Sequence, residues 1–175
     1  MFLVLLALAH FSLFDTAGRL HQESEWAKSK AVVVFFTTTD CPISNGYVPE
    51  MNRIYSDYAK RGVAFYAVQA DTTIPDADVK KHTTDFGFKF PVLLDSKQVL
   101  ARLTGATAIP ESAVLSSDGK VLYLGRIDNR IADIGQSRNA ATEPDLRNAL
   151  DSILASKPMA HPRTTAVGCA INLEK

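Results

Sequence analysis

The stretch AVVVFFTTTDCPISNGYVPEM, residues 31–51, decides the fold of this chain. Residues 31–38 are β-branched, aromatic or apolar at odd and even positions alike, which is typical of a central strand buried on both faces. Cys41 then stands directly before Pro42. Because proline is favoured in the first turn of a helix, the sequence predicts a helix from Pro42 to Arg61, stopped by Gly62. Cys41 is therefore expected where a buried strand ends and a helix begins.

That position gives Cys41 a predicted chemistry. Backbone N–H groups at a helix N-terminus are unpaired and carry the positive end of the helix dipole, which favours a thiolate over a thiol. The thiolate is the form that attacks disulfides and peroxides. We therefore expect Cys41 to be a nucleophile at the sheet edge, within reach of a partner, with Asp40 capping the helix. A buried, inert cysteine is the alternative that the residues leave open.

Around this stretch, strands and helices alternate along the chain, which predicts an α/β fold. The expected strands and hairpins are a hairpin at 11–21, a strand at 63–71, a strand at 90–95 and a hairpin at 111–127. The expected helices are a short segment at 23–29, a helix at 76–86, a helix at 96–105 capped by Ser96, and a final helix at 142–156 that begins with a capping box of Thr142 and Asp145. A loop is expected at 130–141.

Length and composition limit the classes of protein. A chain of 175 residues suits one domain, and a net charge of zero gives no reason to expect nucleic acid or an anionic membrane as partner. Two cysteines and four scattered histidines indicate no structural zinc site, so no metal or cofactor is expected. Residues 1–9 are either a signal-peptide remnant or a first strand, and their apolar run is too short for stable membrane insertion. The oligomeric state stays open.

The chain resembles the thioredoxin-like redoxin family, which includes AhpC/TSA proteins and TlpA/ResA-like thiol–disulfide oxidoreductases. The resemblance covers residues 10–157 and rests on TTDCPISNGYVPEM, FPVLLD, ATAIPESAVLSSDGKVLYLGRID and PDLRNAL. It implies a thioredoxin-like fold: a central mixed sheet flanked by helices, with an N-terminal β-hairpin extension. It also implies thiol–disulfide exchange by Cys41 with a thiol-bearing or disulfide-bearing protein or a small thiol. An extracytoplasmic location, periplasmic or secreted, is favoured over a cytoplasmic one.

The resemblance also assigns residues around Cys41. Ile109-Pro110 matches the position of the family's cis-proline, whose neighbouring backbone lines the substrate groove. Thr38, Thr39, Pro42 and Ser44 are expected to support the thiolate or line that groove. Glu111, the next residue, is expected to face solvent.

The chain departs from the family at the second cysteine of the C-x-x-C motif, which is replaced by Ser44. A local disulfide cannot form, so resolution of a mixed disulfide needs another thiol. Our hypothesis is that Cys169, in the tail 158–175, folds back as the resolving cysteine, with residues 170–173 docking as an edge strand or in the groove. The alternative is an unpaired cysteine in a mobile tail.

Two other functions remain open at this point. The first is a peroxiredoxin-like thiol peroxidase, an antioxidant function for which Thr38 fits the family pattern and Val34 does not. The second is a non-catalytic binding module with the same fold.

Overall fold

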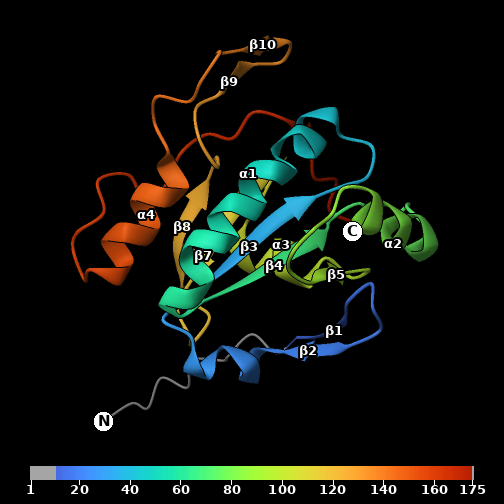
Figure 1. Ribbon diagram of the computed structural model, residues 1–175. Coiled ribbons are helices and arrows are strands. Elements are labelled where there is room, and N and C mark those ends of the chain that lie inside the picture. Colours follow the sequence, from blue (N-terminus) through green and yellow to red (C-terminus); the bar gives the residue numbers. More distant parts are fainter. Residues whose placement is uncertain (1–10, 175) are drawn as a thin grey trace.

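The computed structural model describes residues 11–174. The expectation of a leader or first strand at residues 1–9 lies outside them. The core of the molecule is a five-stranded sheet in the order β5-β4-β3-β7-β8, with β3 parallel to β4 and antiparallel to β7 (Figure 1). The sheet is therefore mixed, as the resemblance implies. Its strands are β3 (Ala31–Thr37), β4 (Val63–Gln69), β5 (Val92–Leu94), β7 (Glu111–Leu115) and β8 (Val121–Gly125).

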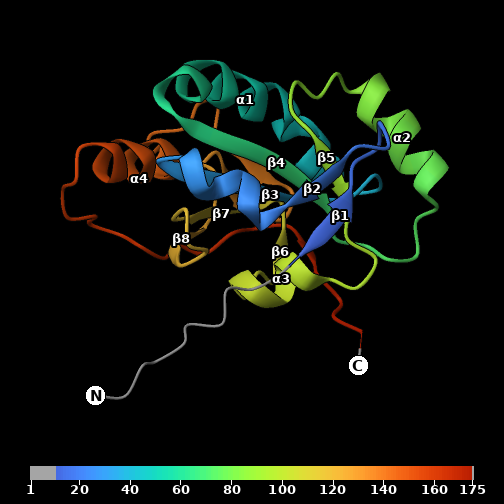
Figure 2. The ribbon, with the colours of Figure 1, turned by 90° about the horizontal axis from the view of Figure 1, so that it is seen from below.

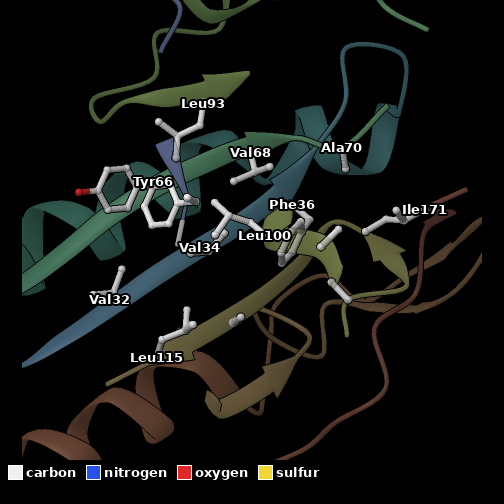
Figure 3. Packing of buried hydrophobic residues seen from close by; sticks show 14 of the residues in the cluster. Val32, Val34, Phe36, Tyr66, Val68, Ala70, Leu93, Leu100, Leu115 and Ile171 are labelled. Carbon is white, nitrogen blue, oxygen red and sulfur yellow. The ribbon is translucent and has the colours of Figure 1, made fainter. Parts of the chain in front are cut away.

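Strand β3 is buried over its whole length, which explains its unbroken apolar sequence. Val32, Val34 and Phe36 point into one half of the core (Figure 3). Val33 and Phe35 point into the other half, on the opposite face of the sheet. Each fully buried side chain of this size stabilises the fold by roughly 1.5–3 kcal/mol relative to an exposed one. The strand that ends at the cysteine is thus held rigidly from both sides.

Helices cover both faces of the sheet. The helices are α1 (Pro42–Tyr58), extended by a 3-10 turn η2 (Ala59–Arg61), α2 (Asp76–Asp85), α3 (Val99–Thr104) and α4 (Asp145–Leu154). Met51 of α1 and Leu146 of α4 pack with Phe35, whereas Leu100 of α3 packs on the other face with Phe36. Figure 2 shows α3 and α1 on opposite sides of the sheet. The predicted helix from Pro42 is confirmed, and Gly62 ends it at a φ of 92°.

The predicted N-terminal hairpin is also confirmed, as β1 (Ser12–Phe14) and β2 (Leu20–Gln22), followed by the 3-10 helix η1 (Glu23–Lys28). His21 holds it together, with its Nε2 3.0 Å from Asp15 Oδ2 and its Nδ1 2.9 Å from Glu25 Oε2. A bridge between Asp15 and Leu93 joins the hairpin to β5.

The predicted helix caps are wrong. Ser96 does not cap α3; the Asp95 carboxylate accepts hydrogen bonds from the N–H groups of Val99 and Leu100, both at 2.8 Å. Helix α4 begins without a side-chain cap, because Thr142 accepts a hydrogen bond from Asn129 at 2.8 Å instead. The expected partner in the capping box, Asp145, accepts a bond from Arg126 Nε at 2.7 Å. At α3 the neighbouring Asp95 takes the role expected of Ser96, and at α4 the expected capping residues bond to distant residues instead.

The predicted loop at 130–141 contains a small hairpin, β9 (Ile131–Asp133) and β10 (Gln136–Ser137). Within residues 11–174, no helix combines the length and the apolar character that crossing a bilayer requires.

The tail after α4 is docked on the domain rather than extended into solvent (Figures 1 and 2). It first lies along β8, where Leu124 N–H donates to Pro162 O at 3.1 Å and Thr164 N–H donates to Leu124 O at 3.2 Å. It then forms β11 (Cys169–Ala170), which pairs antiparallel with β6 (Ala108–Ile109). The expectation that residues 170–173 dock as an edge strand is met at Ala170, and the rest of the tail follows it to α3.

Candidate active site

Cys41 occupies the N-cap position of α1, with Pro42 in the first turn. Strand β3 ends four residues before it, at Thr37, so the buried strand and the helix together fix its backbone. The Cys41 side chain is 0% exposed, which differs from the expectation of a thiol within reach of a partner. The reason is the tail, which packs directly on the sulfur and whose return to this point the local sequence does not encode.

Cys169, in the tail, lies next to Cys41. Cys169 Sγ lies 2.7 Å from Cys41 Sγ, and neither cysteine is in a disulfide. This separation exceeds the S–S bond length of about 2.05 Å, so the arrangement is a close thiol pair from which a disulfide needs only a small movement. The Cys169 S–H donates to Cys41 Sγ, and Cys41 Sγ also lies 3.4 Å from the carbonyl oxygen of Ile109.

The hydrogen bond distinguishes the two sulfurs. Donation to Cys41, reinforced by burial, raises the pKa of Cys169 from its ordinary value of 9.0 to about 11. Cys169 therefore keeps its proton at neutral pH and directs it toward Cys41 Sγ.

The peptide bond between Ile109 and Pro110 is cis, as the resemblance implies. It brings the Ile109 carbonyl beside Cys41 Sγ and leaves the edge of β6 facing the tail. Glu111 stabilises this edge, because its Oε2 accepts hydrogen bonds from Thr107 N–H at 2.7 Å and Ala108 N–H at 3.1 Å. The expectation that Glu111 faces solvent is wrong, since the residue is only 5% exposed. No sequence signal marked it, because its partners lie at the start of a strand only two residues long.

The residues around Cys41 differ in their burial and in their hydrogen bonds. Thr38 Oγ1 is buried with no hydrogen-bond partner among the described residues, whereas Thr39 Oγ1 donates to Asp40 at 2.6 Å. Asp40 is exposed and makes no cap, so that prediction is wrong. Ser44 is buried in the first turn of α1, the helix that follows Cys41.

Sequence reasoning missed Asn45 and His82. Asn45 Nδ2 donates to Thr39 O at 2.9 Å, and its Oδ1 lies 2.8 Å from His82 Nε2. Burial lowers the pKa of His82, so the ring is neutral at neutral pH and donates through Nε2. This chain of contacts ties the loop before Cys41 to α2. The separation of 37 residues between Asn45 and His82 explains why no local pattern announced it.

Hydrogen bonds from Gln98 and Arg102 also hold the end of the tail, after Cys169. Gln98 Nε2 donates to Asn172 O at 2.8 Å, and Gln98 Oε1 accepts from Glu174 N–H at 2.8 Å. Arg102 also donates to Glu174 O. Over the part of the chain that is described, no group of three or more His, Cys, Asp or Glu side chains is placed to hold a metal ion. The site consists of two sulfurs and the backbone around them.

The sheet order, the cysteine at the start of α1 and the cis-proline opposite it define a protein of the thioredoxin-like class. A thiol:disulfide interchange protein of the thioredoxin family from Chlorobium tepidum has the same fold, with a TM-score of 0.60 and 21% identity over 83% of this chain and 93% of its own. The family model Redoxin matches residues 7–145. The chain therefore belongs to the Redoxin family.

Other relatives agree with this assignment. The thiol-disulfide oxidoreductase ResA of Bacillus anthracis is 36% identical over 113 residues, which are 65% of this chain and 64% of that protein. The match thus spans somewhat less than two thirds of the length of that relative. A hypothetical protein from Sinorhizobium meliloti has a TM-score of 0.79 and 27% identity, covering 95% of this chain and 92% of its own.

Proposed function

We propose that the protein is a thiol–disulfide oxidoreductase in which Cys41 is the nucleophile and Cys169 the resolving cysteine. The observation that carries the proposal is the 2.7 Å separation of the two sulfurs. The domain 10–157 supplies the nucleophile and the groove, and the tail 158–175 supplies the second thiol that the Ser44 substitution removes from the usual place. The ResA relatives named as thiol-disulfide oxidoreductases support this activity.

The reaction is a reversible exchange of one disulfide for another. The Cys41 thiolate attacks one sulfur of a client disulfide, and the client's other sulfur leaves as a thiolate that takes up a proton. Cys169 then loses its proton and attacks Cys41 Sγ in the mixed disulfide. The client leaves with its second thiol, and the protein holds a Cys41–Cys169 disulfide. An external dithiol returns that disulfide to two thiols.

The hydrogen bond between the sulfurs suits this order of steps. The Cys169 pKa is raised chiefly because its S–H donates to Cys41 Sγ. When Cys41 Sγ has joined a mixed disulfide it is bonded to the client sulfur and is a weaker acceptor, so that cause is reduced. Cys169 then ionises more readily and becomes a nucleophile at the stage when resolution requires it.

The surrounding residues have proposed supporting roles. Pro42 begins the helix whose dipole favours the thiolate, and Ser44 lies in its first turn. Ile109 and Pro110 form the wall of the groove beside Cys41. Thr38 presents a buried hydroxyl without a partner among the described residues, and Thr39 anchors the loop through its carbonyl. The client is a thiol-bearing or disulfide-bearing protein or a small thiol, and we propose an extracytoplasmic location.

The relatives named in the comparisons favour disulfide exchange over peroxide reduction. The test uses insulin reduction by dithiothreitol together with three full-length proteins: wild type, Cys41→Ser and Cys169→Ser. We expect the wild type to accelerate the reduction and Cys41→Ser to lose the activity. When reduced Cys169→Ser is mixed with insulin and the dithiothreitol has been removed, it should accumulate a mixed disulfide between Cys41 and insulin, visible by mass spectrometry. Activity in Cys41→Ser equal to that of the wild type would overturn the proposal.

A further inference from the structure

The tail occupies the edge of β6 as an added strand. Cys169 pairs with Ile109 and Ala170 with Ala108, in antiparallel register. Ile171 N–H continues the ladder by donating to Thr107 O at 2.9 Å. Main-chain pairing of this kind accepts any extended segment, and selectivity comes from what the edge demands of the side chains. The docked tail therefore shows which side chains this edge accepts.

The first requirement of this edge concerns the residue directly before the cysteine, which is Gly168. A Cβ atom placed on Gly168 would lie 1.9 Å from Ile109 O, 2.6 Å from Ile109 C and 3.2 Å from Pro110 Cδ. Two of these atoms belong to the backbone beside the cis peptide bond, so they cannot move aside as the end of a flexible side chain can. Only glycine fits at this position while the following cysteine reaches Cys41.

The second requirement concerns the residue two positions after the cysteine, which is Ile171. Ile171 is 9% exposed and packs in the same cluster as Phe36 and Leu100, as Figure 3 shows. A branched aliphatic side chain is therefore favoured there. The intervening Ala170 borders a cavity of about 260 Å³ that Asp71 and Thr72 also line. This position has room for a residue larger than alanine.

We propose that the edge of β6 selects extended segments of the form glycine–cysteine–any residue–branched aliphatic, supplied by the tail at rest and by the client during turnover. This inference rests on the proposed function and adds the class of client segment. Since both segments need the same edge and the same approach to Cys41, they compete. The tail is thus an internal occupant that a client displaces.

The tail has a fixed point from which its end can swing. Thr164 is held on β8 by its backbone and by its Oγ1, which accepts from Arg126 N–H at 3.0 Å and lies 2.7 Å from Tyr123 Oη. Residues 165–174 lie beyond that point. When they leave β6, Cys169 stays tethered within about 17 Å of Thr164, because an extended chain spans at most about 3.3 Å per residue. The resolving thiol therefore remains at high effective concentration while the client occupies the edge.

The test measures attack by Cys41 on synthetic nonapeptides. The reference peptide has the tail's own sequence, TAVGCAINL, with its cysteine carrying thionitrobenzoate as a mixed disulfide. The control peptides are TAVACAINL, which changes only the glycine, and TAVGCADNL, which changes only the isoleucine. The Cys41 thiolate attacks the peptide sulfur, the peptide–Cys41 disulfide forms, and thionitrobenzoate leaves with the electron pair of the broken bond. Absorbance follows its release, and mass spectrometry identifies the adduct.

The protein is the full-length chain with Cys169→Ser, which prevents resolution. Two further variants in that background loosen the tail: Ile171→Asp at its buried contact, and Arg102→Ala at its exposed contact with Glu174. Arg102 is exposed, so the second variant remains informative if the first fails to fold. Far-UV circular dichroism checks each protein.

We expect the reference peptide to react about tenfold faster than either control peptide at equal concentration. We also expect loosening of the tail to raise the rate with the reference peptide, because the competitor is weakened. Equal rates for all three peptides would overturn the inference and leave the proposed function intact. Equal rates in the tail variants and their Cys169→Ser parent would overturn the competition. If Cys41 attacks neither the peptides nor free dithionitrobenzoate, the proposed function itself fails.

Discussion

Cys41 and Cys169 are 128 residues apart in the sequence, and their sulfur atoms lie 2.7 Å apart. In the proposed function, the thiol that the family places three residues after the nucleophile is supplied by a tail strand. That strand is held by pairing with β6, by the buried Ile171 and by Gln98. The account depends on this replacement.

The first prediction concerns the pH at which Cys169 ionises. In the reduced protein, alkylation of Cys169 by iodoacetamide should rise with a midpoint near pH 11, because donation to Cys41 raises its pKa to about 11. In Cys41→Ala the acceptor is gone, and the midpoint should fall toward 9. The same midpoint in both proteins would show that the hydrogen bond is not the cause.

The same shift makes docking of the tail dependent on pH. The docked state holds the Cys169 proton more tightly than the undocked state, whose pKa is near 9.0. The stabilisation is therefore complete below about pH 9 and is lost as the pH rises through about 11. Limited proteolysis of the tail in the reduced protein should accelerate across that window. Cleavage that is independent of pH between 8 and 11 would contradict this.

The next prediction concerns Gly168. Gly168→Ala should displace the tail, because the new Cβ would lie 1.9 Å from Ile109 O. Cys41 should then react with maleimide about tenfold faster or more, as its cover is removed. Gly46→Ala is the matched control: a Cβ there meets no atom within 4 Å. In a helix this substitution should stabilise the fold by roughly 0.5–1 kcal/mol and leave Cys41 covered.

Glu111 carries a prediction about the edge of β6. Glu111→Ala removes the acceptor for Thr107 N–H and Ala108 N–H, two part-buried hydrogen bonds, and a typical hydrogen bond contributes roughly 0.5–1.5 kcal/mol. Urea unfolding of the reduced protein should show that loss, with faster alkylation of Cys41. Glu111→Gln keeps an acceptor oxygen and should recover part of the stability. Wild-type stability in the alanine variant would exclude this role.

The central features of the fold followed from local chemistry that the sequence displays together with the resemblance to the redoxin family. The unbroken apolar run of β3, proline at the start of α1 and the match at Ile109-Pro110 were enough to place the sheet, the helix start and the cis bond. The turn residues of the N-terminal hairpin were likewise enough to predict it.

The features that sequence reasoning missed depend on contacts between distant segments. The Glu111 carboxylate accepts hydrogen bonds from Thr107 N–H and Ala108 N–H, at the start of β6, and therefore lies inside the molecule. Asp95, in place of Ser96, accepts the hydrogen bond from the first turn of α3. Asp145 accepts a hydrogen bond from Arg126 instead of taking part in the predicted capping box. Burial of Cys41 by the tail depends on the close approach of Gly168 to Ile109, which no spacing in the sequence reveals.

The most direct test of the central claim is disulfide mapping of the full-length protein after equilibration in an oxidising glutathione buffer. Free thiols are blocked, the protein is digested without reduction, and the peptides are identified by mass spectrometry. The account predicts that the peptide containing Cys41 is linked to the peptide containing Cys169, and that the link is lost in Gly168→Ala. Free thiols, or separate glutathione adducts, at both positions of the wild type would contradict it.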